Sequence, residues 1–281
     1  MASSFLPSAA QLFEKLPRAL RRHRLITGWM ALTGENPLQL VRIRDRAFGF
    51  ADLRDGFLRL IVIEGDFETD FFRIADALLA RGGTFLDVGA NHGLLSLGLA
   101  DRWRDKVAFH LFEPNEELRD SFARSQALYP GMQVTLNPYA VSDKPGTLQI
   151  HFQPGHLGMS HVVPEGGVSI RAIRLDDYLA EKSIDSVELM KIDIEGFELA
   201  GLKGADAALG RQAIKAIYFE YCEKWLRRHH PPAELLEYLK SRGYEPCLVR
   251  ECDLAQRGAS HRLRDDIAGA GLLLRPLGGT P

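Results

Sequence analysis

The segment from residue 84 to residue 100, TFLDVGANHGLLSLGLA, constrains the fold most strongly. A short apolar run leads to Asp87, two glycines then enclose three residues, and apolar residues return at helical spacing. This pattern predicts a buried strand, a tight turn and a helix. In an open α/β sheet such a turn lies at the carboxyl end of a strand, where ligands bind.

The composition of this turn favours a nucleoside over a dinucleotide. A dinucleotide fingerprint reads GxGxxG, but the glycine that admits the pyrophosphate is missing between Gly89 and Gly93. The carboxylate of Asp87 at the strand end would repel a diphosphate and attract a cation. S-adenosylmethionine, which carries a sulfonium and an ammonium group, fits this requirement. The alternative is that Asp87 only caps the turn.

The overall composition indicates a globular protein with a sizeable core. Of its 281 residues, 46% are hydrophobic and 26% are charged. The formal net charge of -2 provides no general attraction to nucleic acid. Three cysteines without a CxxC pair argue against a disulfide framework or a zinc site. No apolar run approaches the ~20 residues of a transmembrane helix. We therefore expect a cytoplasmic protein with no transmembrane segment and no nucleic-acid partner.

The first 65 residues predict a small N-terminal part. Residues 1–30 combine a basic cluster with leucines, as in an amphipathic helix; the cluster is Arg18, Arg21, Arg22, His23 and Arg24. Such a helix could touch a membrane surface or an acidic partner, but we favour a solvated helix packed on the main domain. Two alternating runs, residues 40–43 and 57–63, predict an antiparallel element with a turn at 52–56.

Residues 66–281 predict the main domain. Helical spacing over 66–81 is followed by alternating strands and helices, which indicate a doubly wound α/β sheet. The expected strands are 84–88, 107–112, 133–137, 187–194, 214–220, 244–249 and 270–274, and the expected helices are 93–103, 115–128, 196–208 and 232–242. An insertion at about 146–173 contains two strand-like runs, 147–152 and 168–173. We expect this β-hairpin to hang over the ligand crevice.

Two further strand ends offer groups for a nucleoside. The second strand ends at Glu113-Pro114, where an acid ~20 residues beyond the glycine turn can bind a ribose diol. The alternative is that Glu113 caps the next helix. Beyond the third strand, Ser142 and Asp143 are placed to meet an adenine edge, although this pair is also an ordinary turn signal.

The fourth strand carries alternating charges. Its period of two places Lys191, Asp193 and Glu195 on one face. Charges in a central strand are costly unless they face the crevice or one another, and an ion pair that only satisfies buried charge is the alternative. The fifth strand adds Glu220 at the same rim.

These motifs resemble the FkbM-type S-adenosylmethionine-dependent methyltransferases. The resemblance covers roughly residues 60–250 and lies in four segments, which are DVGANHG (87–93), FEP (112–114), AVSD (140–143) and MKIDIEGFE (190–198). The helix that contains Glu68 and the segment 175–179 are also similar. The resemblance implies a Rossmann-like methyltransferase fold and methyl transfer to a hydroxyl of a sugar, glycan or natural product.

The resemblance also implies roles for individual residues. The methionine end of the cofactor would be lined by Asp87, Gly89, Asn91 and Gly93, with Glu68 nearby. Glu113, followed by Pro114, would hold the ribose, and Ser142 and Asp143 the adenine. His92 stands where the family often has an aliphatic residue; we favour a role in filling the turn over contact with the cofactor.

Removal of the acceptor proton requires a base, for which Asp193 is our first candidate. Glu195, Glu220, His156 and His161 are alternatives, and Lys191 would orient Asp193 or stabilise negative charge. A magnesium site at Asp193, Glu195 and Glu198 is a less favoured interpretation, and we expect no metal. A nicotinamide-dependent oxidoreductase and a non-catalytic S-adenosylmethionine-binding protein remain alternative functions. The sequence leaves open an oligomer and the identity of the acceptor.

Overall fold

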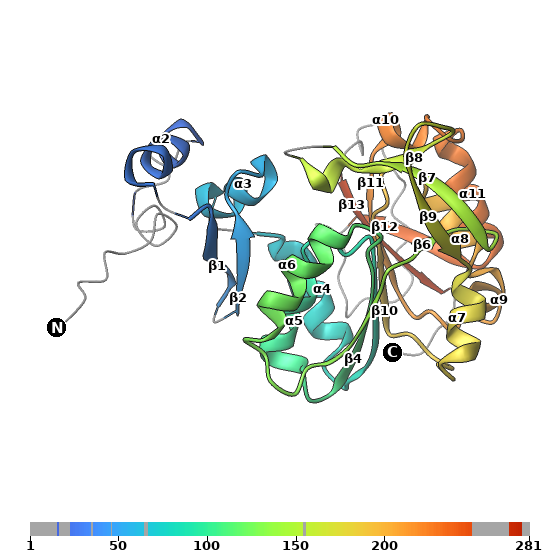
Figure 1. Cartoon of the computed structure of the whole chain (residues 1–281). Helices are drawn as coiled ribbons and strands as arrows, with labels where there is room; N and C mark the ends of the chain where they lie inside the picture. Colours follow the sequence, from blue (N-terminus) through green and yellow to red (C-terminus); the bar gives the residue numbers. More distant parts are fainter. Residues whose placement is uncertain are drawn as a thin grey trace.

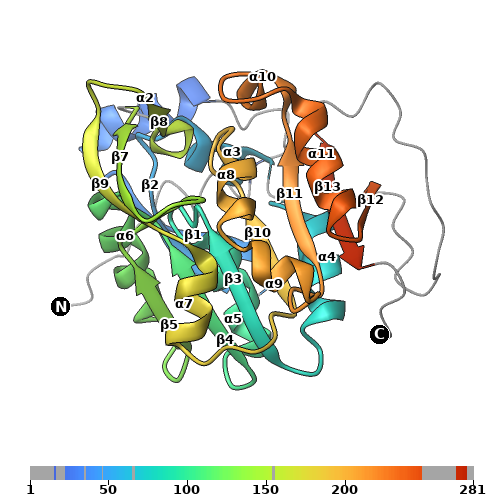
Figure 2. The same ribbon diagram turned by 90° about the vertical axis from the view of Figure 1, so that its right-hand side faces the viewer.

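The computed structural model describes residues 16, 23–34, 36–45, 47–64, 67–153, 156–248 and 270–276. A seven-stranded sheet forms its centre, in the order β12-β13-β11-β10-β3-β4-β5 (Figures 1 and 2). The strands are β3 (Gly83–Val88), β4 (Val107–Phe112), β5 (Gln133–Asn137), β10 (Leu189–Ile192), β11 (Ile217–Tyr221), β12 (Tyr244–Leu248) and β13 (Ala270–Pro276). All neighbours are parallel except β13, which runs antiparallel to both β11 and β12.

Helices cover both faces of this sheet because successive strand residues point to opposite sides. Phe85 packs with one face, which is covered by α4 (Thr69–Leu78), α5 (Leu94–Trp103) and α6 (Glu116–Gln126). Leu86 packs with the other face, covered by α7 (Leu175–Glu181), α8 (Glu198–Lys203), α9 (Asp206–Gly210) and α11 (Pro232–Ser241). The short α10 (Glu223–Leu226) follows β11. The predicted doubly wound α/β fold is confirmed.

The strand order reverses between β3 and β10. The chain passes from β3 to β4 and β5 on one side, and returns to β10 on the other side of β3. The carboxyl ends of these two strands therefore border the crevice in which open α/β sheets bind ligands.

The insertion is larger than the predicted hairpin. The two expected strands are present as β7 (Gly146–His151) and β9 (Val168–Ile173), and they pair antiparallel. A third strand, β8 (His161–Val163), pairs with the other edge of β7, and β6 (Ala140–Val141) pairs with β9. Between β7 and β8 lies the short 3-10 helix η2 (Leu157–Met159). Together these strands form a four-stranded sheet in the order β6-β9-β7-β8.

The N-terminal part differs from the prediction. Strand β1 (Leu38–Arg44) pairs with β2 (Ala47–Asp52), whereas residues 57–63 belong to helix α3 (Gly56–Glu64) and not to a strand. Asp55 explains this difference, because its carboxylate accepts hydrogen bonds from the N–H groups of Phe57 and Leu58 and so caps a helix at this point.

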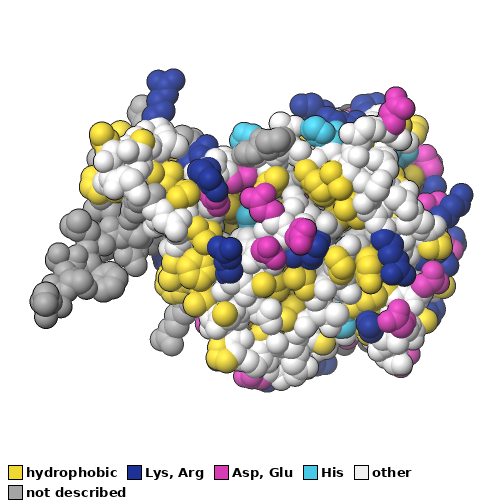
Figure 3. All heavy atoms as spheres, viewed as in Figure 1, with side chains coloured by type: hydrophobic (Ala, Val, Ile, Leu, Met, Phe, Trp, Pro, Cys, Tyr) yellow, Lys and Arg dark blue, Asp and Glu magenta, His cyan; other side chains and the backbone are white. Residues whose placement is uncertain are grey.

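Helix α2 (His23–Thr33) precedes this pair of strands. It buries Ile26 and Met30 and leaves Leu25, Trp29 and Leu32 exposed. Hydrophobic side chains are visible on the lobe that contains this helix (Figure 3). The arginines at positions 18, 21 and 22 lie outside the described residues. Within the described part of the chain, no helix is both long and apolar enough to cross a membrane.

Candidate active site

A buried charge pair joins the ends of β3 and β10. Lys191 lies opposite Asp87 in the register of the two strands, and its Nζ is 3.7 Å from Asp87 Oδ1. The same Nζ donates a hydrogen bond of 2.6 Å to the carbonyl of Gly89 and lies 3.5 Å from Asp193 Oδ2. The second oxygen of Asp87 accepts a hydrogen bond from Ser96 Oγ at 2.7 Å. Lys191 therefore ties the glycine turn to the end of β10.

Each charge of this pair opposes the effect of burial on the other. Burial raises the pKa of Asp87, while Lys191 opposes the rise. Burial by itself would lower the pKa of Lys191, but Asp193, Asp87 and Glu113 outweigh it and hold this pKa above its usual value. A lysine surrounded by three carboxylates stays protonated and acts as a fixed positive charge behind the crevice.

The two glycines of the turn permit close packing. Gly89 has a φ of 75°, and a Cβ there would lie 2.0 Å from the backbone oxygen of Asp193. Gly93 has a φ of 66°, and its Cβ would lie 2.2 Å from the Phe122 ring. Gly89 lines the cavity described next, whereas Gly93 does not. Gly93 therefore packs beneath α5 against Phe122, and its contact with the cofactor stays a prediction.

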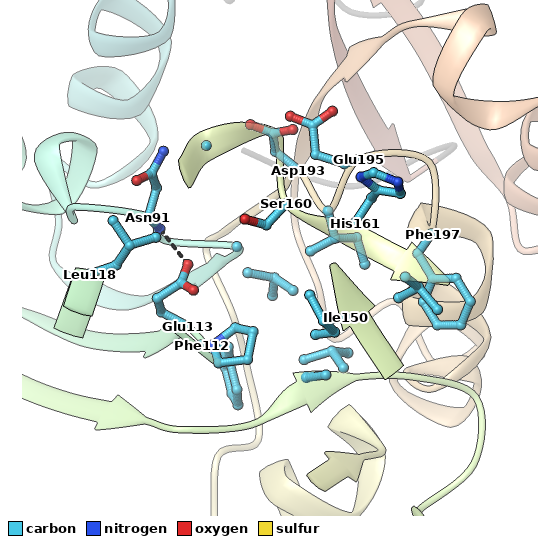
Figure 4. A pocket seen from close by; sticks show the side chains of 18 of the residues that line it. Asn91, Phe112, Glu113, Leu118, Ile150, Ser160, His161, Asp193, Glu195 and Phe197 are labelled. Carbon is cyan, nitrogen blue, oxygen red and sulfur yellow. Dashed lines mark hydrogen bonds between the residues drawn. The ribbon is translucent and has the colours of Figure 1, made fainter. Parts of the chain in front are cut away.

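An inner cavity lies over the carboxyl ends of β3, β4 and β10 (Figure 4). Its floor comes from the glycine turn and the strand ends, and its roof comes from the inserted sheet. Apolar side chains form much of its wall, namely Phe112, Leu118, Val141, Leu148, Ile150, Phe152 and Val162. Polar groups enter it at Asn91, Glu113, Asp193 and Glu195. A mostly apolar pocket with a few convergent polar groups is typical of a small-molecule site.

Glu113 occupies the position expected for a diol-binding acid. It lies at the end of β4 and points into the inner cavity beside Asn91 (Figure 4). Its carboxylate accepts hydrogen bonds of 2.8 Å from the N–H groups of Asn91 and Asn115, and burial raises its pKa to about 7. Each carboxylate oxygen keeps a further lone pair for a ligand hydroxyl. The side-chain oxygen of Asn91 is buried and has no hydrogen-bond partner among the described residues.

Some residues expected to bind the cofactor lie elsewhere. His92 turns away from the inner cavity, and its Nδ1 lies 2.9 Å from Ser121 Oγ of α6. Burial lowers the pKa of His92 to about 4, so the imidazole is neutral. It fills the turn, as in the interpretation that we favoured. Ser142 and Asp143 do not line the inner cavity, and the Ser142 N–H donates a hydrogen bond to the carbonyl of Ile173 in β9. The preceding residues, 139–141, line the cavity in their place.

An outer cavity of about 570 Å³ adjoins the inner one. The two share four residues, Asn91, Gly158, Asp193 and Glu195. The remaining outer wall is formed by α3, the start of α4, the segment around η2, and the chain from β11 to α10. The side chains that it presents include Phe57, Arg59, Glu68, His156, Met159, Glu198, Glu220 and Trp225. Glu68 lines this outer cavity and not the inner one.

The carboxylates around the outer cavity raise one another's pKa. Burial, followed by the charges of Asp193, Glu198 and Glu220, raises the pKa of Glu195 to about 8. Burial also raises the pKa of Glu198 to about 7, although the N–H groups of Ile194 and Gly196 donate to its Oε1. Among the described residues, no group of His, Cys, Asp and Glu side chains has the arrangement needed to hold a metal ion.

Several walls of the two cavities come from distant parts of the chain that carry no sequence motif. Phe57 and Arg59 of α3, Leu157 and Ser160 of the insertion, and Trp225 of α10 line the cavities without belonging to any motif. For the roof of the inner cavity, the sequence did offer a signal, which was the predicted insertion over the crevice. Among the histidines considered, His161 lines the inner cavity and His156 the outer one. The structure thus brings Asp87, Lys191, Asp193, Glu195, Glu113 and Asn91 together.

Comparisons with known proteins agree with this geometry. Residues 87–246 match the family described as the methyltransferase FkbM domain. The chain is 28% identical over 156 residues to the hexuronic acid methyltransferase AglP of Haloferax volcanii, an alignment that covers 54% of this chain and 62% of the relative. It is 27% identical over 176 residues to the 31-O-demethyl-FK506 methyltransferase FkbM of Streptomyces tacrolimicus, covering 50% of this chain and 67% of the relative.

A solved structure of methyltransferase FkbM from Methylobacillus flagellatus KT is also similar. It superposes with a TM-score of 0.46 at 19% identity, over 69% of this chain and 44% of that one. The chain matches about three fifths of the length of the archaeal relative.

Proposed function

The chain belongs to the FkbM methyltransferase family, and on that premise we propose that it transfers a methyl group from S-adenosylmethionine to a hydroxyl group of a small-molecule or sugar acceptor. The observation that carries this proposal is the junction between the two cavities. The inner cavity has the features of a nucleoside site, the outer cavity has room for an acceptor, and both contain Asp193 and Glu195. Methyl transfer needs this arrangement, with donor and acceptor meeting in line.

The residues of the inner cavity fit the proposed cofactor. Glu113 offers carboxylate lone pairs to the ribose hydroxyls, and the apolar wall offers a surface for the adenine ring. The unpartnered oxygen of Asn91 can accept a hydrogen bond from the ligand's ammonium group. Asp193, which borders the same cavity, provides a carboxylate near the positive sulfur. When bound, S-adenosylmethionine supplies a methyl group that is already activated for transfer.

Asp193 is the base that we propose for the acceptor hydroxyl. Its side chain is 45% exposed, so it can reach a ligand, and it borders both cavities. Lys191, 3.5 Å away, holds the carboxylate in place. Glu220 lies at the rim of the outer cavity, where it is placed to orient the acceptor.

Glu195 is the second candidate for this base. It also borders both cavities, and its φ of 55° is unusual for a residue other than glycine, as is often seen at functional sites. Because its pKa is raised to about 8, it would be a stronger base than an ordinary carboxylate but mostly protonated at neutral pH. If Glu195 is the base, kcat/KM rises with pH up to an apparent pKa near 8.

Substitution of each carboxylate tests these roles. We expect Asp193→Asn to lower turnover by about 100-fold, because general bases contribute about 10²–10⁴-fold, while the affinity for S-adenosylhomocysteine changes little. Glu195→Gln serves as the comparison, and Asp185→Asn, in the exposed loop before β10, serves as the control. Unchanged turnover of Asp193→Asn would remove Asp193 from this role, and a large loss in Glu195→Gln alone would assign the base to Glu195.

A binding measurement and a transfer assay test the alternative functions. Calorimetry with S-adenosylhomocysteine and with NAD distinguishes a methyltransferase from a nicotinamide-dependent oxidoreductase, and we expect binding of the former only. Transfer of a labelled methyl group to a panel of sugars and hydroxylated natural products distinguishes an enzyme from a non-catalytic binding protein. Cytoplasmic location belongs to the same proposal, and the free thiol of Cys222 supports it.

A further inference from the structure

The segment from residue 156 to residue 161 forms part of the roof of the inner cavity and is attached to the N-terminal part of the chain. Asp55 makes the attachment. Its Oδ1 caps α3 by accepting from the N–H groups of Phe57 and Leu58, and its Oδ2 accepts a hydrogen bond of 3.1 Å from the N–H of Leu157. Asp55 is 7% exposed, and this hydrogen bond is partly buried. One carboxylate therefore connects the start of α3 to the start of η2.

The neighbouring residue makes a close contact at the same place. A Cβ built on Gly56 would lie 2.4 Å from Cε1 and 3.0 Å from Nδ1 of His156. The helix start and the inserted segment therefore meet with no space for a side chain between them. In Figure 1, α3 lies beside the tip of the inserted sheet, as this contact requires.

A second attachment holds the other end of the segment. The ring of His161 lies 5.5 Å from that of Trp225 in α10, and the guanidinium of Arg228 lies over the indole at 3.9 Å from its centroid. The segment thus spans the site between two anchors that are 170 positions apart in the sequence, at Asp55 and Trp225.

The segment between the anchors closes the inner cavity. Leu157, Gly158, Ser160 and His161 all line that cavity. The room beneath them is only about 80 Å³, whereas small-molecule sites commonly offer about 300 Å³ or more. The cavity must therefore widen to admit a nucleoside, and because this segment forms part of its roof, we infer that the segment moves when the nucleoside enters or leaves.

We propose that Asp55 is a positioning residue, and that its hydrogen bond to Leu157 holds the segment 156–161 over the inner cavity and so sets how long the nucleoside stays bound. The inference rests on the proposed function only for the identity of the nucleoside. Asp55 lies 32 positions before the start of the family match at residue 87, so this role belongs to the N-terminal part of this chain. It gives that part a function in the reaction cycle.

Asp55→Ser separates the two roles of the carboxylate. Serine is as good a helix cap as aspartate, so α3 remains capped, but its shorter side chain has a single oxygen and loses the bond to Leu157. We expect S-adenosylhomocysteine to dissociate about tenfold faster, because a partly buried hydrogen bond to a charged group is lost. Hydrogen exchange at the Leu157 amide should also accelerate in the ligand-free protein, while the midpoint of thermal unfolding changes little. Asp185→Ser, in the exposed loop before β10, is the matched control and should change neither rate.

A second pair of variants tests the same contact from its other side. Gly56→Ala places a methyl group against His156 and should also accelerate dissociation and exchange. His156→Ala removes the obstacle, so the double variant should return to the rates of His156→Ala alone. A purely structural effect of Gly56→Ala on α3 would not be rescued in this way.

The outcomes separate the inference from the proposed function. Unchanged dissociation and exchange rates in Asp55→Ser would overturn the inference, as would equal acceleration in the control. A wild-type protein that fails to bind S-adenosylhomocysteine would overturn the proposed function. The exchange rate of Leu157 in the ligand-free variants would still decide whether Asp55 holds the segment.

Discussion

At the scale of single residues, one lysine compensates the buried negative charge of the site. Lys191 is 6% exposed and is the counter-ion of the fully buried Asp87. Its removal leaves Asp87 Oδ1, which has no hydrogen-bond partner among the described residues, without a compensating charge. A buried charge that loses its partner is strongly destabilising.

We therefore expect Lys191→Met to lower the free energy of unfolding by about 3 kcal/mol, measured by urea denaturation. Lys203→Met is the control, because Lys203 pairs with Glu234 on the surface and should contribute less than about 1 kcal/mol. The double variant with Asp87→Asn should recover part of the loss. Equal effects of the two lysine variants would contradict this account.

The raised pKa values of three glutamates predict how stability depends on pH. Glu113 and Glu198 have pKa values of about 7 and Glu195 of about 8, against about 4.5 when unfolded. The folded protein holds these protons more tightly than the unfolded chain. Their effect on stability is therefore absent below about pH 4.5 and becomes increasingly unfavourable up to about pH 8.

We expect these three groups to make the free energy of unfolding of the ligand-free protein fall between pH 5 and pH 8. Glu195→Gln should flatten part of this slope, because glutamine does not ionise. Glu237→Gln, on the exposed face of α11, should leave it unchanged. Denaturant titrations at several pH values provide the measurement, and a slope that rises with pH and persists in Glu195→Gln would contradict the assignment.

At the scale of the elements, a glycine allows α5 to begin against α6. Gly93 precedes α5 with a φ of 66°, which side chains other than glycine rarely adopt, and Phe122 occupies the space where a Cβ would lie. Phe122 is fully buried, so its ring cannot move aside without disturbing the core.

We expect Gly93→Ala to destabilise the protein by about 2–3 kcal/mol, from overpacking and the left-handed backbone together. Gly28 on α2 has open space around it, and Gly28→Ala should be neutral or stabilising by up to about 1 kcal/mol. Thermal unfolding of both variants provides the comparison. Equal effects at the two positions would show that packing at Phe122 is not the cause.

At the scale of the whole molecule, the N-terminal part shares a core with the sheet. Buried side chains of α2, β1 and β2, among them Ile26 and Val41, belong to the same cluster as Phe85 and Leu111 of the sheet. The hydroxyl of Tyr129 adds two hydrogen bonds to the backbone of Phe48, at 2.6 and 2.7 Å. The division at residue 65 stays a prediction about domains, and these contacts argue that the two parts fold together.

We therefore expect a single unfolding transition that reports on both parts. Tyr129→Phe should lower the free energy of unfolding by about 1–3 kcal/mol, because the N–H and C=O groups of Phe48 lose their partner. Trp29 and Trp103, one in each part, provide fluorescence probes in single-tryptophan variants. Separate midpoints for the two probes would show that the N-terminal part is an independent domain.

Local patterns were sufficient for the sheet and for much of the site. Alternation between strands and helices specified β3, β4 and β5 nearly to the residue. Because strand ends align in a parallel sheet, Asp87, Glu113 and Lys191 lie at one edge, where Glu113 lines the inner cavity and the Asp87–Lys191 pair is buried behind it. Residues 57–63 were wrongly expected to form a strand, because a short apolar run fits a strand and a buried helix equally well, and the cap at Asp55 decided between them.

The sequence by itself determined which residues meet where the backbone periodicity brings them together, as at the carboxyl edge of β3, β4 and β10. Only the tertiary structure decided which of them face a cavity and which pack beneath it. It turned His92 toward α6 and Gly93 toward Phe122, and it joined Asp55 to Leu157 across 102 positions of the chain. The physical reason is the sequence separation of the contacts. A strand or turn depends on residues a few positions apart, whereas the roof of the site depends on contacts between distant residues, which no local pattern encodes.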